Sequence, residues 1–100
     1  MSVLVLVEHP VGVGPYSGFE EWKRVFDSDP VDRKAHGVKR HWIYRSPDAD
    51  DVVIGCEFDS MELARAFKAD HDTTLADAWR ELGLDVSPAR VFELAETVEY

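Results

Sequence analysis

The side chains in this sequence best suited to proton transfer near neutral pH are its four histidines, His9, His36, His41 and His71. His41 lies in the middle of an alternating segment, two residues before Ile43 and on the same face of the expected strand. Its ring would therefore line either a cavity beneath the helices or an interface between subunits. This position makes His41 the first candidate for a general base.

The other three histidines each allow a structural interpretation beside a chemical one. His71 stands between two aspartates, which would either orient its ring in a site or form a solvated turn. His9 ends the first apolar run beside a glycine-rich loop, where a pocket mouth or open solvent is expected. His36 precedes a glycine at an expected helix end, where an imidazole caps carbonyl groups. We therefore predict His71 and His9 as partners of His41 and interpret His36 as structural.

Aromatic and cationic side chains could complete such a site. Tyr44 could donate a hydrogen bond to a phenolate oxygen, and Arg40 or Arg45 could offset the charge of that oxygen. The remaining large rings would wall a flat aromatic ligand or, alternatively, form the hydrophobic core. The candidates for ligand contact among them are Trp22, Phe26, Trp42, Phe67 and Trp79.

No motif for a metal or a bound cofactor stands out, and we predict neither. No two histidines are spaced i, i+4, and the Asp-His-Asp run at 70–72 has no second histidine nearby. A phosphate loop, a dinucleotide fingerprint and a nucleophile elbow are all missing from the sequence. Cys56 lies in an apolar run before an acidic residue, which favours a buried structural thiol over a reactive one.

Composition and charge restrict the partners. The formal net charge is −9, from 20 acidic and 11 basic residues, so nucleic acids and anionic membranes would be repelled on average. No apolar stretch reaches the length of a membrane span, and the apolar run 3–7 lacks the basic segment of a signal peptide. We expect no nucleic-acid or membrane partner, and a cytoplasmic location.

The pattern along the chain predicts one domain, residues 1–100, with the element order β-α-β-β-α-β. Strands are expected at 3–7, 38–45, 52–58 and 90–98. Helices are expected from Phe19 to Phe26, with a short second piece at 31–36, and from about 61 to 82 with a break near 70–73. This order predicts a ferredoxin-like α+β sheet with spatial order 4-1-3-2. The first and third strands should be central because they lack polar alternation.

Such a sheet carries both helices on one face and leaves the other face to be covered. The first strand is apolar at every position, so either Val3, Val5 and Val7 or Leu4 and Leu6 must point away from the helices. The residues alone leave open which set does so. Burial against the same face of a second copy is the simplest remedy, and it predicts a homodimer.

The residues at 33–38, 41–45, 51–54, 57–60 and 66–67 carry a resemblance to a known family. On these segments, and in element order over nearly all of the chain, the sequence resembles the dimeric α/β-barrel superfamily. The most similar part is the antibiotic-biosynthesis-monooxygenase-like and polyketide-cyclase-like group. None of the segments is an invariant catalytic signature, and a proximal haem histidine cannot be identified.

The resemblance implies a barrel formed by two sheets and a range of chemistry. Activities in the superfamily include cofactor-independent oxygenation of polycyclic phenols, polyketide cyclisation, haem degradation and chlorite breakdown, and some members have no assigned reaction. The expectation is therefore a cofactor-independent monooxygenase or cyclase acting on an aromatic or polyketide-like molecule. The alternative is a non-catalytic homodimer that binds a small hydrophobic ligand or serves as an interaction module.

Overall fold

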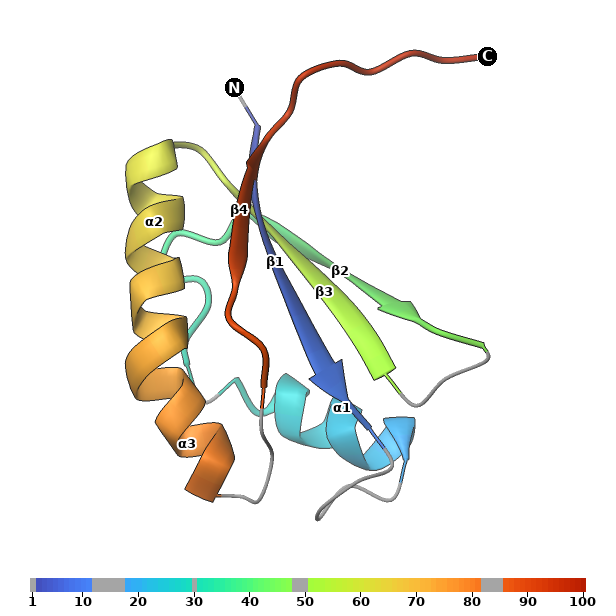
Figure 1. Cartoon of the computed structure of the whole chain (residues 1–100), viewed down its shortest axis with the longest axis vertical. Helices are drawn as coiled ribbons and strands as arrows, with labels where there is room; N and C mark the ends of the chain where they lie inside the picture. Colours follow the sequence, from blue (N-terminus) through green and yellow to red (C-terminus); the bar gives the residue numbers. More distant parts are fainter. Residues whose placement is uncertain (1, 12–17, 30, 48–50, 82–85) are drawn as a thin grey trace.

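The computed structural model describes residues 2–11, 18–29, 31–47, 51–81 and 86–100. Two helical segments lie on one face of a four-stranded sheet (Figure 1). The elements in chain order are β1 (Val3–Pro10), α1 (Phe19–Asp27), β2 (Arg40–Arg45), β3 (Asp51–Phe58), α2 (Met61–Asp70), the π-helical turn η1 (His71–Leu75), α3 (Ala76–Glu81) and β4 (Arg90–Glu93). None of the helices in these ranges is long and apolar enough to cross a membrane.

The sheet has the order β2-β3-β1-β4, and each strand pairs antiparallel with its neighbour. This is the predicted ferredoxin-like order read from the other edge, so the predicted fold class is confirmed. β1 and β3 are central because their apolar residues are covered, whereas the more polar β2 and β4 form the edges. The register places His41 of β2 opposite Cys56 of β3.

The burial pattern of β1 resolves which residues of the first strand face the helices. Val3, Val5 and Val7 are buried in the core, whereas Leu4 and Leu6 remain partly exposed on the opposite face. We call the helix-covered side the inner face and the opposite side the outer face. The core is completed from α1, α2 and β3, mainly by Trp22, Phe26, Val52, Ile54, Phe58, Ala64 and Phe67.

The long helical segment continues where a break was expected. Residues 61–81 run without interruption through α2, η1 and α3, so the predicted break near 70–73 is wrong. Asp70 and His71 keep right-handed helical dihedral angles, and the helix widens to a π turn there instead of ending. Such turns insert one residue and are frequent at functional sites. Ser60 caps the start of α2 by accepting a hydrogen bond from the Leu63 amide.

Two further expectations were wrong. Residues 31–36 form turns instead of a short helix, because Asp29 and Asp32 adopt positive φ angles of 51° and 53°. The last strand ends at Glu93 instead of residue 98. Glu93 pairs with Val3 at the start of β1, so the following residues have no strand beside them. Residues 94–100 extend as an arm away from the sheet (Figure 1).

Candidate functional site

A cavity of about 40 Å³ lies on the inner face, between the sheet and the helices. This volume holds roughly three water-sized spheres. Most of the side chains around it are apolar, and two are imidazoles. The lining residues are Val7, His9, Phe26, Val31, Arg33, Ile54, Cys56, Phe67, His71, Leu75 and Trp79. Val31, Arg33 and Leu75 keep partial solvent exposure, so they mark the side on which the cavity opens.

His9 reaches the cavity from the end of β1, because the strand alternation places it on the same face as the buried valines. Its side chain is 4% exposed. The indole Nε1–H of Trp22, on α1, donates to His9 Nδ1 at 3.1 Å. Among the described residues, His9 Nε2 has no hydrogen-bond partner. One ring nitrogen is therefore held by the protein, and the other is buried without a partner in a residue that lines the cavity.

The protonation state of His9 follows from its surroundings. Burial, and secondly the nearby His71 ring, lower the pKa of His9 from its ordinary 6.5 to about 3. The Trp79 ring meets His9 edge-on with the two centroids 4.9 Å apart, which adds to its apolar environment. His9 is thus a neutral imidazole at physiological pH.

His71 reaches the cavity from the first position of the π turn. It is 3% exposed, and its ring stacks on that of His9 with centroids 6.4 Å apart and an angle of 26° between the planes. Its Nδ1 lies 3.1 Å from Oδ1 of Asp72. His71 Nε2, like that of His9, finds no hydrogen-bond partner within the part of the chain that is described.

Asp72 is held in place from three directions. Its Oδ1 accepts a hydrogen bond of 2.8 Å from the Ala89 amide, just before β4, and its Oδ2 pairs with Lys68 one turn earlier. Burial acts to raise the pKa of Asp72, but the hydrogen bonds from Lys68, Ala89 and His71 outweigh it and lower that pKa. Asp72 is therefore a fixed carboxylate behind His71.

The arrangement is suited to acid–base chemistry on a small molecule. A histidine whose one nitrogen contacts a carboxylate can take up a proton at the other nitrogen, because the carboxylate stabilises the imidazolium. The apolar walls strengthen any charge interaction inside the cavity. Among the described residues, no group of three or more His, Cys, Asp or Glu side chains could hold a metal ion.

The structure brings together five of the residues predicted from the sequence. His9, Phe26, Phe67, His71 and Trp79 line the same cavity. Trp22 lies directly behind His9, to which it donates its hydrogen bond. Catalytic and ligand-binding roles for these residues remain predictions.

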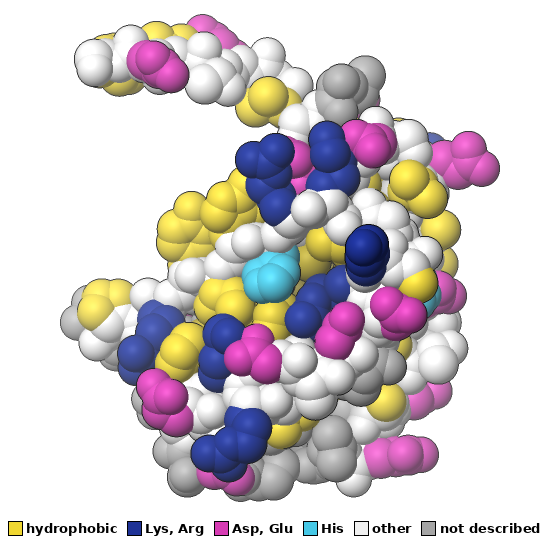
Figure 2. Space-filling view, turned by 180° about the vertical axis from the view of Figure 1, so that it is seen from behind, with side chains coloured by type: hydrophobic (Ala, Val, Ile, Leu, Met, Phe, Trp, Pro, Cys, Tyr) yellow, Lys and Arg dark blue, Asp and Glu magenta, His cyan; other side chains and the backbone are white. Residues whose placement is uncertain are grey.

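His41, the first candidate from the sequence, lies outside this cavity. It is on the helix side of the edge strand β2, exposed, with its ring edge-on to Phe26 at 5.2 Å between centroids. It borders a wider surface hollow with Arg33, Lys39 and other charged residues, and Figure 2 shows Lys and Arg side chains gathered on this side of the molecule. Desolvation, and secondly Arg33, lower the pKa of His41.

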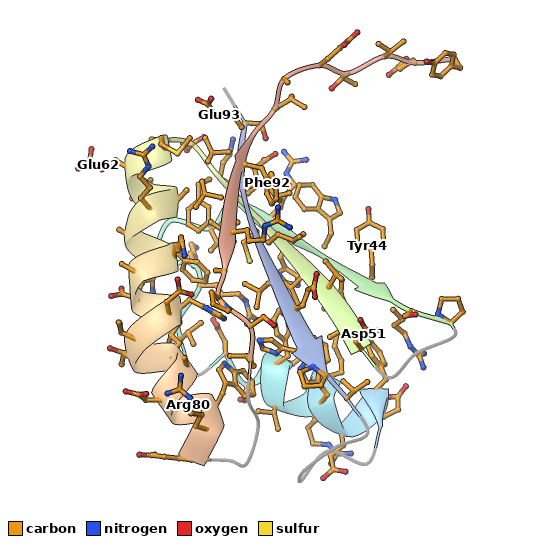
Figure 3. The ribbon with its side chains drawn as sticks, viewed as in Figure 1. Tyr44, Asp51, Glu62, Arg80, Phe92 and Glu93 are labelled. Carbon is orange, nitrogen blue, oxygen red and sulfur yellow. The ribbon has the colours of Figure 1, made fainter. Side chains whose placement is uncertain are left out.

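The remaining candidates are also separate from the cavity. Trp42 and Tyr44 lie on the outer face, where Tyr44 projects away from the helices (Figure 3). Arg40 pairs with Glu57 at 3.0 Å. The guanidinium of Arg45 lies over the Phe19 ring. A single site that combines His41, Tyr44 and an arginine is therefore not formed within one chain.

Sequence reasoning missed several lining residues, among them Arg33 and Leu75. A helical spacing would have identified Leu75. Four lining residues of the long helical segment follow one another at intervals of four: Phe67, His71, Leu75 and Trp79. Arg33 has no such signal, since it lies in the turns before β2, where its guanidinium lies over the Phe26 ring.

The comparisons with known proteins bear on the fold. No protein-family model matches this sequence, and no curated protein matches it. Three solved structures are similar over almost the whole of both chains.

One of them is SnoaB, a cofactor-independent oxygenase from Streptomyces nogalater, with 20% identity, a TM-score of 0.68, and coverage of 99% of this chain and 98% of that one. Another is a protein from Deinococcus radiodurans assigned provisionally as an antibiotic biosynthesis monooxygenase, with 14% identity, a TM-score of 0.61, and coverage of 98% and 97%. Rv0793 from Mycobacterium tuberculosis has 18% identity, a TM-score of 0.56, and coverage of 99% and 98%. At these identities the likeness concerns the fold, and at that level it confirms the resemblance predicted from the sequence.

Proposed function

We propose that this chain, whose fold is that of the antibiotic-biosynthesis-monooxygenase-like α/β proteins, is a small enzyme that removes a proton from an aromatic or polyketide-like molecule. The proton transfer would be the protein's part in a cofactor-independent oxygenation or cyclisation. The observation that carries the proposal is the pair of buried imidazoles, His9 and His71, each with Nε2 unpartnered at an apolar cavity. The similarity in fold to a cofactor-independent oxygenase supports it.

The unpartnered nitrogens are costly to the folded protein. A buried polar atom without a hydrogen bond costs about 1–3 kcal/mol, and two such atoms belong to residues that line the same small cavity. Packing alone would favour apolar side chains at both positions. A bound molecule that contacts both nitrogens would remove this cost, so binding is the simplest reason for the pair.

In the proposed reaction His71 is the base. Its Nε2 takes the substrate proton, and Asp72 stabilises the imidazolium through Nδ1. Neutral His9 contacts the oxygen on which charge develops. The cavity accommodates only the reacting edge of a flat molecule, so the rest of the substrate would extend past Val31 and Leu75, the exposed side of the lining.

The test is turnover by the His71→Gln variant. Wild-type protein is incubated with a panel of tricyclic phenols and enolisable ketones, while oxygen uptake and substrate absorbance are followed. We expect His71→Gln to lower kcat/KM by about 10²–10⁴, the usual contribution of a general base. His36→Gln is the matched control, because His36 contacts Asp32 and Asp70 outside the cavity. Equal turnover by wild type and His71→Gln would contradict the proposal.

The same assay tests the sequence-based assignment of His41. Its substitution by Gln should leave kcat/KM within about threefold of the wild type if the cavity is the site, because a contribution from general-base catalysis would be far larger. A large loss in His41→Gln together with a normal His71→Gln would move the site to the β2 edge.

The mostly apolar lining of the cavity favours a second candidate function. Such a cavity would suit a non-catalytic domain that holds one edge of a hydrophobic ligand. That alternative predicts saturable binding of panel members, with binding weakened in His71→Gln and no turnover by either protein.

We further propose that the protein forms a homodimer through its outer face. An apolar hollow of about 540 Å³ lies between this face and the C-terminal arm. Figure 2 shows hydrophobic side chains gathered beneath the arm. Its apolar walls come from β1, β2 and β4, namely Leu4, Leu6, Trp42, Tyr44 and Phe92. A second copy would cover these side chains, and the arm, with its exposed Leu94 and Val98, would gain a surface to pack on.

Sedimentation at micromolar concentration tests the dimer. The wild type should sediment at about twice the 11.4 kDa chain mass. Trp42→Glu should sediment as a folded single chain, because it places a charge in the proposed interface. Leu63→Glu is the control, since Leu63 on α2 is 40% exposed, close to the 37% of Trp42, but lies outside the outer face. A wild-type monomer at this concentration would contradict the proposal.

A further inference from the structure

We propose that Trp22 and Asp72 fix opposite tautomers for the neutral forms of the two cavity imidazoles, so that these forms offer one donor, His9 Nε2–H, and one acceptor, His71 Nε2. This inference deepens the proposed function and uses the same cavity, but it concerns where each ring carries its proton and can be tested without turnover. Trp22 and Asp72 are positioning residues, since each acts through a histidine.

The tautomer of His9 follows from the chemistry of the indole. The Trp22 Nε1–H group can only donate, so His9 Nδ1, 3.1 Å away, must offer its lone pair. A neutral imidazole carries one proton, and that proton is therefore on Nε2. His9 remains neutral because it is buried with Trp22 and Trp79 against its ring. The buried, unpartnered nitrogen of His9 is therefore a hydrogen-bond donor.

The tautomer of His71 follows from the carboxylate beside it. An ionised carboxylate can only accept, so His71 Nδ1, 3.1 Å from Asp72 Oδ1, carries its proton there. The Ala89 amide and Lys68 hold the carboxylate from the other sides, which keeps it from turning away. In the neutral ring Nε2 then has a free lone pair, and the second cavity nitrogen is an acceptor.

A donor beside an acceptor selects a ligand group that has both functions. The hydroxyl of a phenol or an enol donates to His71 Nε2 and accepts from His9 Nε2–H, whereas an ether oxygen can only accept. If the hydroxyl ionises, its O–H bond breaks, the proton moves to His71 Nε2, and the electron pair stays on oxygen. His9 Nε2–H then stabilises that oxyanion.

Proton-detected ¹⁵N spectra of the histidine rings at neutral pH test the tautomers in the full chain. We expect His9 to show a protonated Nε2 and a bare Nδ1, and His71 to show a protonated Nδ1. Assignment of His9 as the Nδ1–H form, as a charged ring, or as a rapid mixture of forms would overturn the inference. If the tautomers are as stated but no turnover exists, the proposed function fails while the inference stands.

Trp22→Phe tests the cause, because it keeps an aromatic ring and removes only the donor. The spectrum of His9 should then show a mixture of the Nδ1–H and Nε2–H tautomers. Phe26→Leu is the matched control: it removes a ring that stacks on Trp22 with centroids 5.1 Å apart but leaves the indole donor, so His9 should keep its tautomer. An unchanged His9 in a folded Trp22→Phe protein would overturn the role of Trp22. If Trp22→Phe does not fold, the inference is judged from the tautomers in the wild-type spectrum alone.

Three probes of similar size test the recognition. Phenol can donate and accept, anisole can only accept, and toluene can do neither. Each lost hydrogen bond should weaken binding about threefold to tenfold, so the affinities should fall from phenol to anisole to toluene. Phenol binding no tighter than toluene, or no binding of any probe, would overturn the selection of a hydroxyl group.

Discussion

The two faces of the sheet are formed by alternate residues of the same strands. One face leaves polar atoms without hydrogen bonds, whereas the other leaves apolar side chains uncovered. On the inner face, polar atoms of His9 and His71 are buried without a partner among the described residues. On the outer face, apolar rings such as Trp42 and Phe92 remain in contact with solvent. A small molecule with polar groups could satisfy the atoms of the inner face, and a protein surface could cover the rings of the outer face.

His41 and Tyr44, predicted from the sequence to share one site, lie on different faces of the sheet. Tyr44 and His41 are three residues apart on β2, and pairing them in one site seemed natural. Strand alternation instead sends Tyr44 to the outer face with Trp42, and His41 to the side of Phe26. The proposed proton transfer and the proposed dimer thus use different sides of the same strands, so a substitution on one side tests one proposal without the other.

Lowering the pH should destabilise the folded protein through a group on the inner face, and this is the largest effect that we expect. The pKa of His9 is about 3 in the folded protein and near 6.5 when the ring is exposed, so between these values only the unfolded chain binds this proton. The free energy of unfolding should therefore fall as pH drops from about 6.5 towards 3, by about 1.4 kcal/mol per pH unit from this group. Among the described residues, the charged or titratable groups that line the cavity with His9 are Arg33, Cys56 and His71.

Urea unfolding of wild type and His9→Gln at pH 7, 6, 5 and 4 measures the effect. The difference in unfolding free energy between the two should narrow towards low pH, because Gln cannot gain a proton. His36→Gln is the control for the substitution itself, since it replaces an imidazole that lies outside the cavity. Parallel curves for wild type and His9→Gln would show that His9 is protonated inside the fold.

The reactivity of the Cys56 thiol should show the next largest effect, as a difference between folded and unfolded protein. Burial raises the pKa of Cys56 from its ordinary 9.0 to about 11, with a smaller opposite effect of Arg33. Two pKa units reduce the thiolate fraction about 100-fold near neutral pH, and the thiolate is the reactive form. Iodoacetamide at pH 8 should therefore label folded protein at least about 100-fold more slowly than protein in urea. Labelling at similar rates would show that the inner face opens readily.

The sheet could be predicted from sequence because its signals are local and redundant. The unbroken apolar runs at 3–7 and 52–58 require two covered strands, and the element order then leaves one simple topology. Which parity of β1 meets the helices could not be predicted, because Val3, Val5 and Val7 are as apolar as Leu4 and Leu6. The helices settle this choice only when they pack.

The site was harder to predict than the sheet. Whether a side chain is buried depends on the face to which it points and also on whether its strand is central or at an edge. His41 has the inner parity, but β2 is an edge strand, so its ring remains exposed. His71 has polar neighbours that suggested a turn, yet the π turn directs it into the core while Asp72 reaches the Ala89 amide 17 residues away. No local pattern reports a contact over that distance.

The smallest expected difference between the two faces is the free-energy cost of adding carbon atoms to a small residue. A Cβ at Gly55, on the outer face, would lie 3.0 Å from Leu4 Cδ1 and 3.4 Å from Trp42 Cε3. Because Leu4 is only partly buried and its end can turn, Gly55→Ala should change the free energy of unfolding by less than about 1 kcal/mol. Ala64→Val, at a fully buried position of α2, should cost about 1–3 kcal/mol by overpacking.

Urea unfolding at two protein concentrations extends this contrast to the dimer. If a second copy covers the outer face, the cost of Gly55→Ala should rise with protein concentration, because the added carbon presses Leu4 and Trp42 towards the partner. The cost of Ala64→Val should stay constant, since Ala64 packs within one chain. A cost for Gly55→Ala that equals that of Ala64→Val at low concentration would mean that the outer face is as tightly packed as the inner one.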